Sequence, residues 1–166
     1  MRMIISRVYL LSAIFLIFAF IQQAVWYPNY YAQSGTPVVT QNFIAPEKGC
    51  NWLGVAGQVF DLDGIPVEGI TILLGGQLES EDVLLVAATG SSQQMGPGGF
   101  EIQLSDHPVS THGDLFLQIV DASGAPLSRR LYFHTVDACD QNLTVVNLIE
   151  FETAGENYLP AILNSR

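Results

Sequence analysis

The stretch VAGQVFDLDGIPVEGITILL, residues 55–74, has the pattern of two β-strands joined by a tight turn. Residues 55–60 alternate with the two-residue period of a sheet, with Val55 and Val59 on one face. Asp61, Gly64 and Pro66 then supply turn chemistry, because each of these residue types favours a turn conformation. The run that follows, residues 70–74, is rich in β-branched side chains and predicts the second strand.

Further segments have the composition of short strands, and no helical period follows residue 30. Residues 121–126 repeat the Asp, Gly, Pro pattern of the first turn. The strands that we expect are residues 52–60, 69–74, 83–89, 100–104, 115–120, 128–135 and 142–151. This pattern predicts an all-β fold, a seven-stranded antiparallel sandwich. Its expected core consists of Val55, Val59, Ile70, Ile72, Leu74, Leu85, Phe100, Ile102, Leu104, Leu115, Leu117, Ile119 and Leu131.

Two of these segments resemble a known family. Residues 57–72 have the pattern G-x-V-x-D-x-x-G-x-P-V-x-G-x-x-I. In its glycines, Asp61 and Pro66 this pattern resembles the start of carboxypeptidase-regulatory-like domains. Gly98-Gly99-Phe100-Glu101-Ile102 resembles a later strand of that family. The resemblance covers residues 53–151 and implies a transthyretin-like or immunoglobulin-like sandwich. The family shares no catalytic residues, so the resemblance implies a non-enzymatic module and transfers no site.

The first 32 residues have the features of an export segment. Arg2 and Arg7 precede an uncharged apolar run, residues 8–21. That run fits a secretory signal, and its extension to residue 27 fits a membrane anchor of about 30 Å. A cluster of Trp26, Tyr27, Tyr30 and Tyr31 favours the anchor, because aromatic side chains gather at the membrane interface. In both interpretations the later residues are exported, either to the outer face of the membrane or as a secreted domain.

The remaining boundaries follow from composition. Residues 33–49 hold two prolines, two glycines and no sustained period, which predicts a linker. We expect the sandwich domain at residues 50–152 and a tail at residues 153–166. Cys50 and Cys139 stand at the edges of predicted strands, about 90 residues apart, and in an exported protein such a pair predicts a disulfide. Two buried free thiols are the alternative.

The charge balance excludes one class of partner. The net charge is −10, from 6 basic and 16 acidic residues. Without Arg2 and Arg7, four basic residues stand against the same 16 acidic ones, a net charge of −12. Such a surface repels nucleic acid, so we expect no nucleic-acid partner. The membrane, through the N-terminal helix, and a partner protein are the contacts that we expect.

Catalytic and metal-binding patterns are weak. Asp106-His107 and His112-x-Asp114 place carboxylates beside imidazoles, but both pairs fall in a polar loop segment, and His134 stands apart. Asp61-x-Asp63-Gly64 has only the opening of a calcium loop, and an Asx-stabilised turn is the simpler interpretation. We therefore expect no enzyme activity, no cofactor and no resident metal.

Four aromatic residues suggest a surface for binding. Trp52, Phe60, Phe116 and Tyr132 fall on the opposite strand phase from the expected core. On one exposed face they would form a platform for a partner or a sugar, unless another layer covers them. Our leading hypothesis is a non-catalytic, extracytoplasmic, membrane-anchored sandwich with a structural or protein-interaction role. The alternatives are an accessory single-helix subunit of a larger membrane complex and a carbohydrate-binding module.

Overall fold

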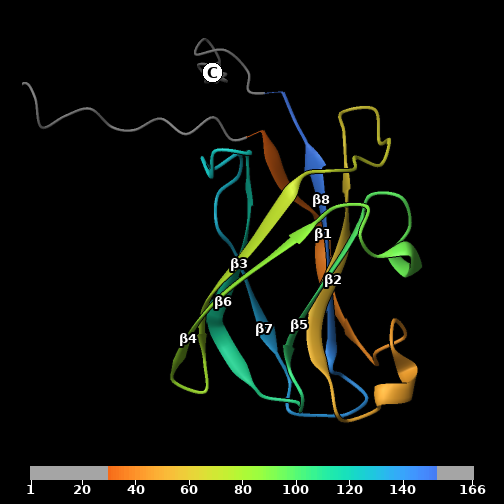
Figure 1. The fold of residues 1–166 in the computed structure, drawn as a ribbon, viewed down its shortest axis with the longest axis vertical. Helices are drawn as coiled ribbons and strands as arrows, with labels where there is room; N and C mark the ends of the chain where they lie inside the picture. Colours follow the sequence, from red (N-terminus) through yellow and green to blue (C-terminus); the bar gives the residue numbers. More distant parts are fainter. Residues whose placement is uncertain (1–29, 153–166) are drawn as a thin grey trace, which may run out of the picture.

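Two four-stranded β-sheets, packed face to face, make up the part of the chain that the computed structural model describes, residues 30–152 (Figure 1). The strands are β1 (Tyr31–Thr40), β2 (Leu53–Phe60), β3 (Thr71–Leu78), β4 (Glu81–Ala88), β5 (Gly99–Ser105), β6 (Thr111–Val120), β7 (Leu131–Thr135) and β8 (Leu143–Glu150). Two short 3-10 helices, η1 (Pro46–Lys48) and η2 (Gln93–Met95), lie in connections. The expected all-β fold is confirmed, with eight strands in place of seven.

The predicted leader helix, with Trp26 and Tyr27, and the predicted tail lie outside the described residues. Between residues 30 and 152 the structure has no helix with the length and apolar character needed to cross a membrane.

The eighth strand is β1, in the segment predicted as a linker, so that prediction was wrong. β1 pairs with β8 from Tyr31↔Glu150 to Thr40↔Leu143, and the register shifts between Ser34 and Val38. Gly35, with φ of 74°, and Pro37 lie inside this irregularity. A bulge at a sheet edge tolerates glycine and proline, which is why the segment lacked an alternating pattern and still forms a strand.

The strand order is β1-β8-β2-β5 in one sheet, called sheet A here, and β4-β3-β6-β7 in the other, sheet B (Figure 1). All neighbours pair antiparallel except β2 and β8, which pair in parallel from Gly54↔Leu143 to Phe60↔Ile149. The expectation of a purely antiparallel sandwich was therefore wrong at this pair. Gly57 is required there, because a Cβ at that position would collide with the carbonyl oxygen of Val146.

The core lies between the two sheets and contains the side chains that the alternation predicted. Val55, Val59, Ile72 and Phe100 are completely buried in it. The other expected core residues are buried in the same cluster or packed against it as partly buried side chains: Ile70, Leu74, Leu85, Ile102, Leu104, Leu115, Leu117, Ile119 and Leu131. The strand phases are therefore those that the sequence predicted.

Tyr31 belongs to this core as well, which corrects its assignment to a membrane-interface belt. It is the first residue of β1, 9% exposed, and forms an isolated bridge to Ser128. Burial raises the pKa of its hydroxyl, and the nearby carboxylates of Glu150 and Asp61 raise it further. Tyr30 is 39% exposed and donates its backbone N–H to the oxygen of Leu127. Both residues are thus tied to the sandwich.

Candidate interaction face

The four aromatic residues predicted to share one face lie on both sheets. Trp52 directly precedes β2 and Phe60 ends it, in sheet A, whereas Phe116 in β6 and Tyr132 in β7 belong to sheet B. The sandwich core separates the two outer faces. The predicted single aromatic platform therefore does not exist.

The outer face of sheet A is covered by the chain's own connections. Trp52 is completely buried in a second apolar cluster with Ile44, Ala56, Met95 and Leu143. Ile44 comes from the segment between β1 and β2, and Met95 from η2. A covered Trp52 cannot stack on a sugar, so the carbohydrate hypothesis loses its main platform.

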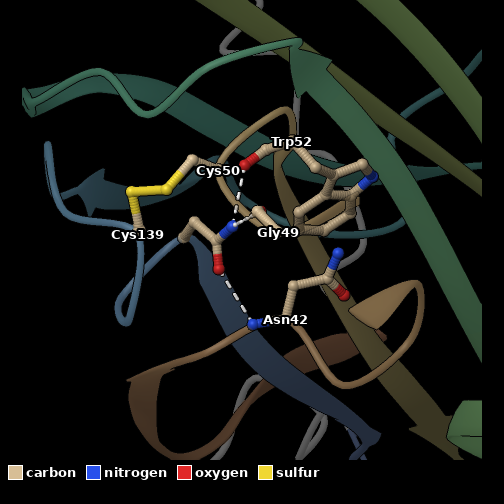
Figure 2. The surroundings of a disulfide bond; sticks show 6 residues. Asn42, Gly49, Cys50, Trp52 and Cys139 are labelled. Atoms are coloured by element: carbon tan, nitrogen blue, oxygen red, sulfur yellow. Dashed lines mark hydrogen bonds between the residues drawn. A yellow bond between two sulfur atoms is a disulfide. The ribbon is translucent and has the colours of Figure 1, made fainter. Parts of the chain in front are cut away.

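Hydrogen bonds of two buried asparagines hold this cover in place. Asn142 accepts the backbone N–H of Asn42 at 2.8 Å and donates to the carbonyl oxygens of Gly49 and Trp52, each at 2.9 Å. Asn42 in turn accepts the N–H groups of Ile44 and of the residue after it. Figure 2 shows Asn42, Gly49 and Trp52 around this network. The covering segment, residues 41–49, is thereby fastened to the start of β8.

The predicted disulfide is present beside the same network. Cys50 follows the covering segment directly and is bonded to Cys139 in the loop before β8, 89 residues away (Figure 2). It therefore joins the end of the cover to the strand that the cover lies against. A disulfide indicates an oxidising, extracytoplasmic environment.

The outer face of sheet B has no such cover in the part of the chain that is described. Leu84 is 70% exposed, Val86 64% and Tyr132 57%, while Leu73 between them is half-buried. The ladder places Leu84 opposite Gly75, Gly75 opposite Phe116 and Phe116 opposite Tyr132. These residues form an apolar row across all four strands. We call Leu73, Leu84, Val86, Phe116 and Tyr132 the bare face.

Phe116, 9% exposed, lies over Gly75 at the centre of the bare face, because the glycine leaves room for its ring. A Cβ on Gly75 would be only 2.7 Å from Cζ of Phe116. The ring of Tyr132 packs edge-on against Phe116 with centroids 5.8 Å apart, and the Arg130 guanidinium lies 4.3 Å from the Phe116 centroid. Such contacts orient aromatic rings and a cation at a protein surface. The bare face is therefore an ordered apolar surface.

Arg130 also gives the bare face a positive margin in an acidic domain. Arg129 and Arg130 are adjacent, both are exposed, and Lys48 is the other basic residue among residues 30–152. Within those residues neither arginine makes an ion pair. Their guanidinium groups are thus available to an acidic partner.

The two predicted Asp–His pairs do not share a loop: Asp106 and His107 lie between β5 and β6, whereas His112 and Asp114 lie in β6. Nδ1 of His107 lies 2.7 Å from Oδ1 of Asp106 and 3.1 Å from Oγ of Ser105, so the carboxylate and the hydroxyl meet the same ring nitrogen. A Ser-His-Asp triad needs them on different nitrogens. Hydrogen bonds to Asp106 and Glu79 raise the pKa of His107, and the bond from His107 lowers the pKa of Asp106.

The predicted acidic turns use their carboxylates as caps. Oδ1 of Asp61 accepts the backbone N–H groups of Asp63 and Ile65 at 3.0 and 2.8 Å. Asp121 does the same for Ser123 and Ala125, and the hydroxyl of Ser123 is the main cause of the lowered pKa of Asp121. Among the described residues, no group of three or more His, Cys, Asp or Glu has a metal-binding arrangement.

Sequence reasoning missed two features of this molecule. The cover on sheet A depends on which connection crosses which face, and no local pattern carries that information. The apolar row on sheet B combines residues from four strands, so it appears only when the register is known. Strand β4 carries a local signal of this surface. Its residues are apolar in both strand phases, which is typical of a central strand, and yet β4 lies at the edge of sheet B.

Comparison with protein-family models, with curated proteins and with solved structures finds no match to this chain.

Proposed function

We propose that this chain is a non-catalytic extracytoplasmic module of the carboxypeptidase-regulatory-like type, held at the membrane by its N-terminal segment, that binds a partner protein on the bare face. The observation that carries the proposal is the contrast in cover. The chain buries its large aromatic residue on sheet A under its own connections, and it leaves Leu84, Val86 and Tyr132 exposed on sheet B. Contiguous exposed apolar surface with a polar margin is typical of interaction sites.

The positive charge of Arg130 at the margin of the bare face indicates the kind of partner surface that fits. Arg130 stacks on Phe116 and makes no ion pair among the described residues, in a chain of net charge −10. A protein surface with apolar side chains and a carboxylate opposite Arg130 complements this arrangement. If the partner is itself a membrane protein, the chain serves as its accessory subunit.

The test is site-specific cross-linking in intact cells. A photo-crosslinking amino acid replaces Leu84, and in a matched control it replaces Leu62, an equally apolar exposed residue of the β2–β3 turn. We expect one protein product from position 84 and none from position 62. Arg130→Glu should abolish the product, and reversing the partner's acidic residue at the cross-linked site should restore it.

Three outcomes contradict the proposal. Equal products from both positions would show non-specific contact. A product with the mass of two copies would show self-association in place of a separate partner. A product whose yield is unchanged in Arg130→Glu would show that Arg130 does not contact an acidic surface of the partner.

A further inference from the structure

Two of the three histidines meet on sheet B. His112 in β6 and His134 in β7 are directly opposite each other in the antiparallel ladder. Both are exposed, whereas their neighbours Thr111, Phe133 and Thr135 are buried. Residues opposite each other in a ladder project from the same face, so the two imidazoles share the outer face of the sheet. In the sequence they are 22 positions apart and gave no metal-binding spacing.

Neither imidazole ring makes a hydrogen bond to another group among residues 30–152. Only the backbone of these residues is hydrogen-bonded: His112 donates its N–H to Oδ2 of Asp114, and the carbonyl oxygen of His134 accepts the hydroxyl of Thr144. His107, the third histidine, has its ring nitrogens engaged by Asp106, Ser105 and Glu79. The ring nitrogens of the pair are therefore available as ligands.

The surface beside the pair is hollowed. His112, His134 and Tyr132 line an open depression of about 530 Å³. Gly113, with φ of 91°, lies in its wall, and a Cβ there would contact nothing within 4 Å. The register between β6 and β7 shifts just after His112, so the strand is irregular beside the two rings. An ion and its water ligands have room at this place.

We propose that His112 and His134 bind one divalent transition-metal ion of the zinc, copper or nickel class. Neutral imidazole is a preferred ligand of these ions. Cross-strand Cβ atoms stand about 4.5–5.5 Å apart, and metal–nitrogen bonds are about 2.0–2.1 Å, so both rings can reach one ion. The carboxylate of Asp114 lies beside His112. With two histidine ligands the ion keeps coordination positions open for water or for a side chain of another protein.

The experiment uses the full chain in detergent, purified with an affinity tag that contains no histidine, and Zn²⁺ in competition with a chromogenic chelator. We expect one equivalent of Zn²⁺ to bind to the wild-type chain. His112→Ala and His134→Ala should each weaken binding at least about tenfold, since even the loss of groups behind a ligand costs 10–100-fold. His107→Ala, the matched control, should leave the affinity unchanged.

A second measurement locates the ion. Paramagnetic Ni²⁺ should broaden the ring signals of His112 and His134 in a histidine-selective NMR spectrum and leave the His107 signal sharp. Zinc binding that is unchanged in both His112→Ala and His134→Ala, or that disappears in His107→Ala, overturns the proposal. So does an absence of binding up to about millimolar Zn²⁺, because a two-histidine site that weak would hold no ion. None of these results depends on a partner for the bare face.

Discussion

The two outer faces of the sandwich carry aromatic residues in the same strand phase, and the most buried of these residues, Trp52, and the most exposed, Tyr132, lie on opposite faces. On sheet A, Trp52 is completely buried beneath Ile44 and Met95. On sheet B, Tyr132 is 57% exposed, whereas the neighbouring Phe116 is 9% exposed and packs against Tyr132 and Arg130. Strand pattern alone is the same in both cases. Trp52 and Tyr132 differ because a connection of the chain crosses only the first of them, while Phe116 shows that side chains of the same face can also bury a ring.

The largest loss in the free energy of unfolding should come from removing the disulfide at the end of the covering segment. We expect Cys50→Ser combined with Cys139→Ser to lower the free energy of unfolding by about 4–5 kcal/mol, because the bond closes a loop of 89 residues in the unfolded chain. Urea unfolding followed by tryptophan fluorescence measures this value. A loss below about 1 kcal/mol would contradict the expectation that closing this loop in the unfolded chain is the main contribution of the bond.

Truncating one aromatic residue on each face tests the comparison directly. Trp52→Ala should cost about 3–5 kcal/mol of unfolding free energy, as for other large buried side chains. Tyr132→Ala should stay within about 1 kcal/mol, because its ring is largely exposed and mainly contacts Phe116.

The indole of Trp52 allows a finer control. Its N–H is the one buried side-chain polar atom without a hydrogen-bond partner among residues 30–152. Trp52→Phe removes this unsatisfied donor and keeps an aromatic ring, so it should cost much less than Trp52→Ala. Equal losses for the two variants would mean that the indole N–H contributes to stability after all.

The next effect concerns the hydrogen bonds that hold the cover. Asn142→Ala removes three bonds and leaves the Asn42 N–H and two carbonyl oxygens without their side-chain partner. We expect a loss of about 1–3 kcal/mol, the usual cost of leaving buried polar groups unsatisfied. The exposed neighbour Gln141→Ala should change nothing measurable. Faster hydrogen exchange at Ile44 in Asn142→Ala would locate the loss in the cover, and unchanged exchange there would contradict this account.

Local sequence patterns predicted part of this fold correctly. Strands and turns came from local patterns: residues 55–74 gave β2, a capped turn and β3, and Asp121 repeats the cap of Asp61. The core phases followed from the same alternation. Each of these features is decided by residues within a few positions of one another, which is why pattern alone could predict them.

Features decided by distant residues were missed. Strand β1 is stabilised by β8, more than 100 positions away, and its bulge hides the alternation. The parallel pairing of β2 with β8 has no local signal either. The disulfide was predicted because paired cysteines in an exported chain carry their own chemistry. The meeting of His112 with His134 needed the register of β6 and β7, which no spacing in the sequence encodes.

On the bare face, substitutions should affect binding and leave stability almost unchanged. Leu84→Lys combined with Val86→Lys places two charges on side chains that are already 70% and 64% exposed. We expect the unfolding free energy to change by no more than about 0.5 kcal/mol per site, as for other surface positions. With the photo-crosslinking amino acid moved from position 84 to position 132, on the same face, we expect a product in the otherwise unchanged chain and none in this double variant. A stability loss as large as that of Trp52→Ala would show that this face is covered by the chain itself.

The smallest effect is a pH dependence at the turn between β3 and β4. Glu79 and Ser80 in this turn adopt positive φ. The turn also contacts His107, whose Nε2 lies 3.4 Å from Oε1 of Glu79. The contact is about half exposed, in contrast to the buried bonds that fasten the cover on sheet A.

The sign of the effect follows from the pKa. Hydrogen bonds to Asp106 and then to Glu79 raise the pKa of His107 above its ordinary value of 6.5. A raised pKa in the folded state means that protonated His107 stabilises the fold below that ordinary value, and the gain is lost as the pH rises through the raised pKa. Wild-type protein should therefore exceed His107→Gln in melting temperature at about pH 6 and lose this advantage by about pH 8.5. Because the contact is exposed, about 0.5 M salt should shrink the difference. An advantage that grows with pH would mean that the imidazole is neutral in this contact, and that the turn between β3 and β4 is held by its backbone alone.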